Sequence, residues 1–101
     1  ALKDGAAFKT VTYQMTPKMS TYLLALVVGE FDGISTTSNN IVTTVYTAPG
    51  KAHQAEFCLD TASRCLNLYQ ELFQVPYPLT KSDLLAIPDF AAGAMENWYA
   101  Q

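Results

Sequence analysis

The chain has 101 residues, a length that suits one domain or parts of two. Half of the residues are hydrophobic and only 15% are charged, which excludes a disordered segment. The net charge of −3 comes from scattered acidic residues, and Lys and Arg form no cluster, so nucleic acid is not expected as a partner.

The first half of the sequence has the patterns of β-structure. Residues 8–15 alternate between apolar and polar side chains, which predicts a half-buried strand. Residues 21–31 are apolar on both faces and predict a strand that is covered from two sides. The stretch "ISTTSNN", 34–40, is interpreted as a loop, and "IVTTVYT", 41–47, as another strand. The longest apolar run, 22–28, is too short for a membrane helix, which needs about 20 residues.

The periodicity changes after the Pro49-Gly50 pair. From Ala52 onward apolar residues recur every three to four positions, which predicts an amphipathic helix that ends near Phe73. A short strand is expected at 84–88, where a proline stops it. We therefore place a domain boundary between residues 48 and 49. Because these strands are too few to close a sheet, the chain is expected to be part of a larger protein.

Several polar residues have a structural interpretation beside a functional one. Cys58 and Cys65 are seven residues apart on the predicted helix, about 10 Å by the helical rise, so we expect two buried, unbridged thiols, as in a reducing compartment. His53 is expected to be a surface histidine, and no metal site is expected because this histidine and two cysteines match no zinc pattern. Asp83 and Asp89 could act as an acid/base pair, although such residues more often cap strand ends.

One carboxylate, Glu96, follows a run of very small residues, 91–94. A glutamate in a loop is usually just solvated. Here Gly93 and Ala94 would let a ligand approach the backbone closely, and the amide of Asn97 could hold the loop. Larger apolar walls would come from Met95, Trp98 and Tyr99. This combination suits a pocket for a small cation such as an ammonium group.

The "GAMEN" sequence, 93–97, resembles the exopeptidase motif of the zinc aminopeptidases of the aminopeptidase N and puromycin-sensitive type. Three longer blocks resemble consecutive parts of that family: "MSTYLLALVVGEF" at 19–31, "YTAPGKAHQAEFCLDTASRCLNLYQELF" at 46–73 and "VPYPLTKSDLLAIPDFAAGAMENW" at 75–98. The likeness extends from residue 11 to 98, whereas 99–101 depart from the family pattern.

The resemblance implies an α+β chain that joins two domains. Residues 1–48 would be the carboxy-terminal part of a β-rich amino-terminal domain, and 49–101 the incomplete start of a thermolysin-like catalytic domain. The implied function is part of a zinc-dependent aminopeptidase that removes amino-terminal residues from peptides. Its partners would be peptides with a free amino terminus and the remainder of the catalytic domain. The alternative is a non-catalytic remnant or a protein-interaction module.

The resemblance also implies roles for individual residues. Glu96 would pair with the substrate's α-ammonium group, Gly93 and Ala94 would line the peptide with backbone groups, Met95 would border the first side-chain pocket, and Asn97 would brace the loop. Zinc, the cofactor of the longer enzyme, would be held by a downstream H-E-x-x-H motif.

A chain with one histidine cannot supply that motif. We therefore expect no catalytic residue and no metal ligand in this chain, and no activity of the isolated chain. A cytoplasmic location is expected from the absence of a signal peptide and from the unbridged thiols. A secreted or membrane-anchored longer protein remains the alternative.

Overall fold

The computed structural model describes residues 2–3 and 6–97. Its contacts divide the chain into two compact units. The larger unit is Val27–Met95, and the other unit combines the two chain ends, up to Leu26 and from Glu96 onward.

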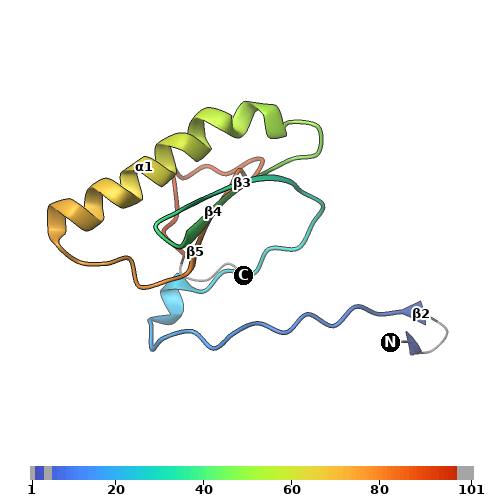
Figure 1. Ribbon diagram of the computed structural model, residues 1–101. Coiled ribbons are helices and arrows are strands. Elements are labelled where there is room, and N and C mark those ends of the chain that lie inside the picture. The colour runs from blue at the N-terminus through green and yellow to red at the C-terminus, as the bar shows by residue number, and fades with distance from the viewer. Residues whose placement is uncertain (1, 4–5, 98–101) are drawn as a thin grey trace. The chain divides into compact units, whose positions relative to one another are not determined.

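The larger unit contains a three-stranded sheet and one helix (Figure 1). Strand β4 (Ile41–Thr47) is central, with β3 (Asp32–Ser38) antiparallel on one side and β5 (Lys81–Leu85) parallel on the other. Parallel neighbours require a crossover connection, which here consists of the 3-10 helix η2 (Ala52–Ala55) and helix α1 (Glu56–Phe73). The sheet therefore joins strands from both sides of the predicted boundary at 48/49.

Strands β3 and β4 form a tight hairpin. Ser38 pairs with Ile41, so the loop has only two residues, Asn39 and Asn40, with φ angles of 50° and 61°. Two consecutive positive φ angles are the mark of a type I′ turn, whose twist matches that of the flanking strands. The interpretation of 34–40 as a loop was therefore wrong, because most of this stretch is strand β3.

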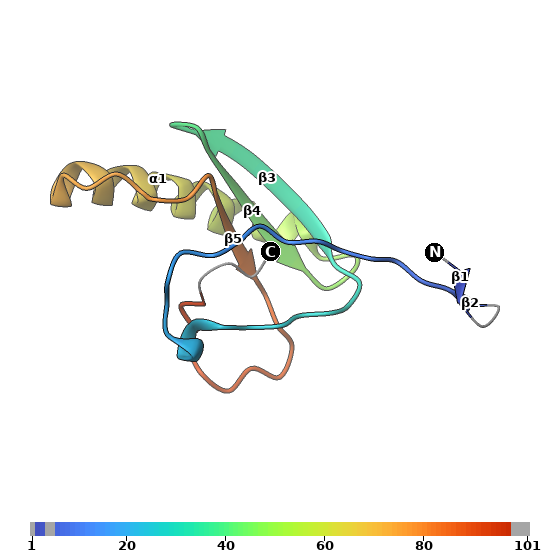
Figure 2. The same cartoon turned by 90° about the horizontal axis from the view of Figure 1, so that it is seen from below.

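Helix α1 packs on one face of the sheet (Figures 1 and 2). Four buried side chains alternate along β4, as expected for the face that a helix covers: Ile41, Thr43, Val45 and Thr47. Thr44, on the opposite face of the strand, is buried as well. The helix also contacts the end of the hairpin, because Asn67 Nδ2 donates a hydrogen bond to Ser38 Oγ at 2.9 Å. The core is thus a thin layer between α1 and the middle strand.

The predicted helix is confirmed at both ends. It begins as η2 at Ala52 and ends as α1 at Phe73. Gln74 follows with φ 53° and ψ 35°, the left-handed conformation in which many helices end. Gln70, near the end of α1, also binds the segment that follows the helix. Its Oε1 atom accepts a hydrogen bond from Tyr77 N at 2.8 Å. The final strand was predicted at 84–88, and the structure places it earlier, at Lys81–Leu85.

The strands predicted at 8–15 and 21–31 are wrong. In its described residues, the smaller unit has only a two-residue pair, β1 (Leu2–Lys3) with β2 (Ala6–Ala7), and a 3-10 helix, η1 (Thr21–Leu23). Residues 8–20 and 24–31 have no regular structure, and Val28 is 90% exposed. A strand needs a neighbour for its backbone groups, and no described strand pairs with these segments.

The described residues therefore form a small α+β structure, in agreement with the expected fold class at that level. The assignment to the end of a β-rich domain and the start of a thermolysin-like domain stays a prediction. No helix in the described ranges is long and apolar enough to span a membrane.

Candidate functional site

The loop that contains Glu96 begins at the end of strand β5. Pairing with β4 continues one residue beyond the strand, where Ala86 N donates a hydrogen bond to Tyr46 O at 2.9 Å. The chain then turns at Pro88 and Asp89, and from Phe90 to the last described residue it has no regular secondary structure. The sheet therefore provides a fixed starting point for the loop.

The small residues before Glu96 leave the backbone open. All four residues at 91–94 are exposed. A Cβ atom added to Gly93 would meet nothing within 4 Å, and the φ of this glycine is not in the left-handed region. Gly93 is therefore not required by a close contact or by a special backbone conformation within the described structure. What it provides is access to the backbone.

The remaining residues of the predicted site differ in exposure. Glu96 is exposed, whereas Met95 and Asn97 are half-buried. Met95 belongs to the larger unit, while Glu96 and Asn97 belong to the smaller one. Neither Glu96 nor Asn97 forms a hydrogen bond or an ion pair with another described residue. The expected walls at Trp98 and Tyr99 lie outside the described residues.

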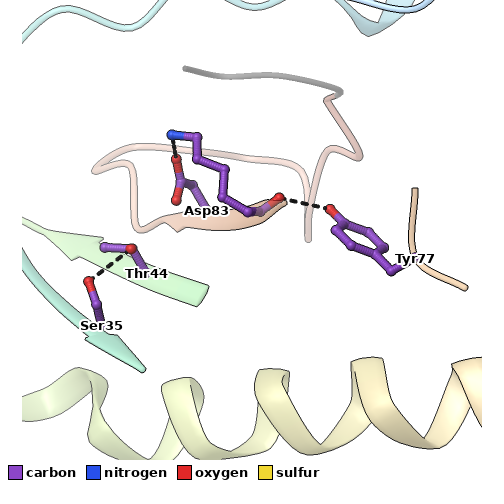
Figure 3. A network of polar contacts seen from close by, with 5 residues as sticks. Ser35, Thr44, Tyr77 and Asp83 are labelled. Atoms are coloured by element: carbon purple, nitrogen blue, oxygen red, sulfur yellow. Dashed lines mark hydrogen bonds and ion pairs between the residues drawn. The ribbon is translucent and has the colours of Figure 1, made fainter. Parts of the chain in front are cut away.

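A polar network lies on the other face of the sheet, opposite to the face that α1 covers (Figure 3). Lys81 Nζ pairs with Asp83 Oδ2 at 2.5 Å, and the Asp83 side chain is only 6% exposed. Thr44, in register with Asp83, shares a hydrogen bond of 2.9 Å with Ser35. The Tyr77 hydroxyl donates to the carbonyl of Lys81 at 3.3 Å, which adds a contact to β5.

This network was missed in the sequence. Its signal is the spacing of Lys81 and Asp83, because residues two apart on a strand share one face. Asp83 and Asp89 have different surroundings, since the first is buried in an ion pair and the second is exposed in a turn. The structure therefore gives no support to an acid/base pair made of these two carboxylates.

The candidate metal ligands are dispersed. His53 is exposed in η2, as expected. Cys58 and Cys65 are free thiols, which confirms that they do not bridge, but Cys58 is exposed and the prediction that both are buried was wrong. Among residues 2–3 and 6–97, no group of three His, Cys, Asp or Glu could hold a metal ion. The described residues therefore do not fit a zinc site.

A shallow groove lies where the β3–β4 hairpin meets the end of α1. It is lined by Asn39, Asn67, Gln70, Glu71, Gln74 and Pro76. Three of its amides are already used within the fold: Asn39 Nδ2 donates to Asn67 Oδ1 at 2.7 Å, and Gln70 accepts from the backbone of Tyr77. These amides therefore stabilise the fold and leave few free groups for a ligand.

Comparison with known proteins decides the family. Residues 57–101 match the model of the peptidase family M1 domain. The chain is 55% identical over 97 residues to Aminopeptidase M1 of Arabidopsis thaliana and 50% identical over 91 residues to a puromycin-sensitive aminopeptidase of Caenorhabditis elegans. The chain belongs to peptidase family M1. These matches cover 95% and 89% of this M1 chain.

The M1 chain is much shorter than its relatives. It spans 11% of the Arabidopsis protein and 10% of the Caenorhabditis protein. A human relative, Endoplasmic reticulum aminopeptidase 1, is 47% identical over 87 residues, which is 85% of this chain and 9% of the relative. Because one relative is named for the endoplasmic reticulum, the cytoplasmic location of this M1 chain stays a prediction.

Proposed function

We propose that this M1 segment is part of a zinc-dependent aminopeptidase and that its loop Gly93–Asn97 binds the free α-amino group of a peptide substrate. The observation that carries the proposal is Glu96, an exposed carboxylate without a described partner, directly after a stretch of open backbone. The names of the relatives support the peptidase class.

The chemistry of this loop suits a peptide amino terminus. An α-ammonium group carries a positive charge and three donors, and a carboxylate accepts from it in a charge-assisted hydrogen bond. Gly93 and Ala94 are exposed and place no bulky side chain beside the backbone, so a peptide can hydrogen-bond to it. A substrate held at its charged end presents its first peptide bond at a fixed distance from the anchor, which is the requirement of an exopeptidase.

Met95 and Asn97 have secondary roles in this proposal. The half-buried thioether of Met95 offers an adaptable apolar surface for the first side chain of the substrate. The amide of Asn97 is free to bond to the substrate or to parts of the longer protein, since it has no hydrogen bond with a described residue. Both roles come from the resemblance of this loop to the family motif.

The segment provides substrate binding and no metal chemistry. Its described residues do not fit a zinc site, and its single histidine cannot form the H-E-x-x-H motif. Zinc therefore belongs to the longer enzyme, and the catalytic residues are expected there as well.

The decisive experiment replaces Glu96 in the longer enzyme. Because an uncharged side chain loses the charge-assisted bond, E96A and E96Q are expected to lower kcat/KM for an unblocked aminoacyl anilide about 30- to 100-fold. The matched control is E71Q, an exposed glutamate on α1 with no part in the loop. Turnover by E96A equal to that of the control overturns the proposal.

The alternative, a non-catalytic interaction module, is favoured by exposed apolar side chains. Phe57 and Phe73 on α1 are 83% and 66% exposed. Exposed apolar surface of this kind favours association with another surface. An H-E-x-x-H sequence in the coding region downstream of this segment decides for the aminopeptidase, and its absence decides for the module.

A further inference from the structure

A turn at Pro88 and Asp89 lies between strand β5 and the loop Gly93–Asn97. Strand pairing ends with the bond from Ala86 N to Tyr46 O. Beyond it, residues 87–95 make no hydrogen bond with any described residue. Backbone bonds therefore do not fix the direction of this stretch, which leaves its dihedral angles and its side-chain packing to do so.

Asp89 has an uncommon backbone conformation, with a φ of 56°. Proline fixes its own φ near −65°, and a positive φ at the residue after it is typical of type II turns. That second position favours glycine, because a Cβ atom in the left-handed region is strained, and Asn and Asp tolerate it best among the other residues.

The other left-handed residues have ordinary explanations. Asn39 and Asn40 form the two-residue hairpin, and Gln74 ends helix α1. Asp89 is the remaining non-glycine case among residues 2–3 and 6–97, and it lies between the sheet and the open backbone of the loop. Its carboxylate is exposed and makes no bond with a described residue, so the side chain does not stabilise the turn.

We propose that Asp89 is a positioning residue of the amino-group binding loop, acting through its left-handed backbone. Together with Pro88 it sets the direction in which the chain leaves β5, and so the place of Gly93 and Ala94. The inference rests on the proposed function of the loop. In this inference, the loop depends on the positive φ of residue 89 and not on the charge of its side chain.

The test compares substitutions that differ in their tolerance of a positive φ, made in the longer enzyme. Glycine in D89G and asparagine in D89N tolerate a positive φ, whereas alanine in D89A and valine in D89V are strained in it. Kinetics are measured with alanine 4-nitroanilide, whose amino group is free. We expect D89G and D89N to keep KM within about twofold of the parent, and D89A and D89V to raise it about five- to tenfold with a smaller change in kcat.

Two outcomes overturn the inference. Equal KM values for all four variants show that the backbone at residue 89 does not position the loop. A rise in KM for D89G as large as that for D89A shows that the carboxylate matters instead.

A substrate-free measurement separates this inference from the proposed function. Hydrogen exchange of the Ala86 amide, the last one bonded to the sheet before the turn, is expected to be faster in D89A than in D89G, whatever the loop binds. If E96A leaves KM unchanged, the proposed function fails while the exchange difference still supports the turn. If E96A raises KM but D89A and D89G agree in both KM and exchange, the inference about Asp89 alone fails.

Discussion

The carboxylate of Asp32 accepts a hydrogen bond from the backbone N–H of Gly50, with Oδ2 and N 2.7 Å apart. Asp32 is the first residue of β3, and Gly50 lies in the turn that leaves β4. One side chain thus closes the open end of the hairpin at the point where the chain departs toward η2. The contact joins β3 to the connection that leads, through α1, to β5.

Removal of this contact should destabilise the sheet. We expect D32A to lower the free energy of unfolding of the chain by about 1 to 1.5 kcal/mol, because an N–H donor loses a charged acceptor. Urea unfolding followed by circular dichroism measures the change. D32N keeps an acceptor oxygen and should lose less, so equal losses for D32A and D32N argue against the hydrogen bond as the cause.

Gly50 itself is needed for its conformation. Its φ is 83°, and an added Cβ atom would meet nothing within 4 Å, so the cost of G50A arises in the backbone alone. We expect G50A to lower the free energy of unfolding by about 1 to 2 kcal/mol. G93A is the matched control, because Gly93 also has open space around it but no positive φ. The same loss in both variants contradicts this explanation.

The buried ion pair of β5 should be sensitive to the loss of one partner. Asp83 is 6% exposed and Lys81 is 33% exposed at the side chain. D83A leaves the ammonium group without its acceptor, and we expect a loss of about 1 to 3 kcal/mol of unfolding free energy. The double variant K81M/D83L removes both charges and should recover part of that loss. A double variant less stable than D83A would mean that the pair is not the origin of the effect.

The chain alone should have no peptidase activity. We expect it to hold no catalytic zinc, because it has one histidine and its described residues include no group of three that could hold a metal ion. Incubated with zinc and alanine 4-nitroanilide, the purified 101-residue chain is expected to release no nitroaniline above the buffer rate. Release that depends on zinc and stops with a chelator contradicts this expectation.

The sequence predicted best the helix, whose hydrogen bonds and apolar pattern lie within one continuous segment. Helix α1 was found because apolar residues recur with the helical period over its whole length. Strand β3 was missed because its Ser and Thr residues resemble a loop, although the Asn39-Asn40 pair at its end is a hairpin signal. The strands expected at 8–15 and 21–31 failed for the opposite reason, since their apolar pattern has no partner strand among the described residues.

The candidate site was predictable in composition but not in geometry. The residues of the loop Gly93–Asn97 were predicted as a site from a local sequence pattern and a family resemblance. The structure adds that there is open space beside Gly93. The left-handed φ of Asp89 could not be read from the sequence, because aspartate adopts ordinary conformations in most turns. The Lys81–Asp83 pair was missed because the strand was predicted at 84–88, whereas β5 spans Lys81–Leu85 and places both residues on one face.

From the parallel pairing of β4 with β5 we expect an order of events during folding. Strand β3 reaches β4 through a two-residue turn, whereas β5 can dock only after the whole crossover through α1 has been made. Contacts between residues distant in sequence form late, because the intervening chain must be ordered first. We therefore expect β5, from whose end the chain continues toward Glu96, to dock after the β3–β4 hairpin has formed.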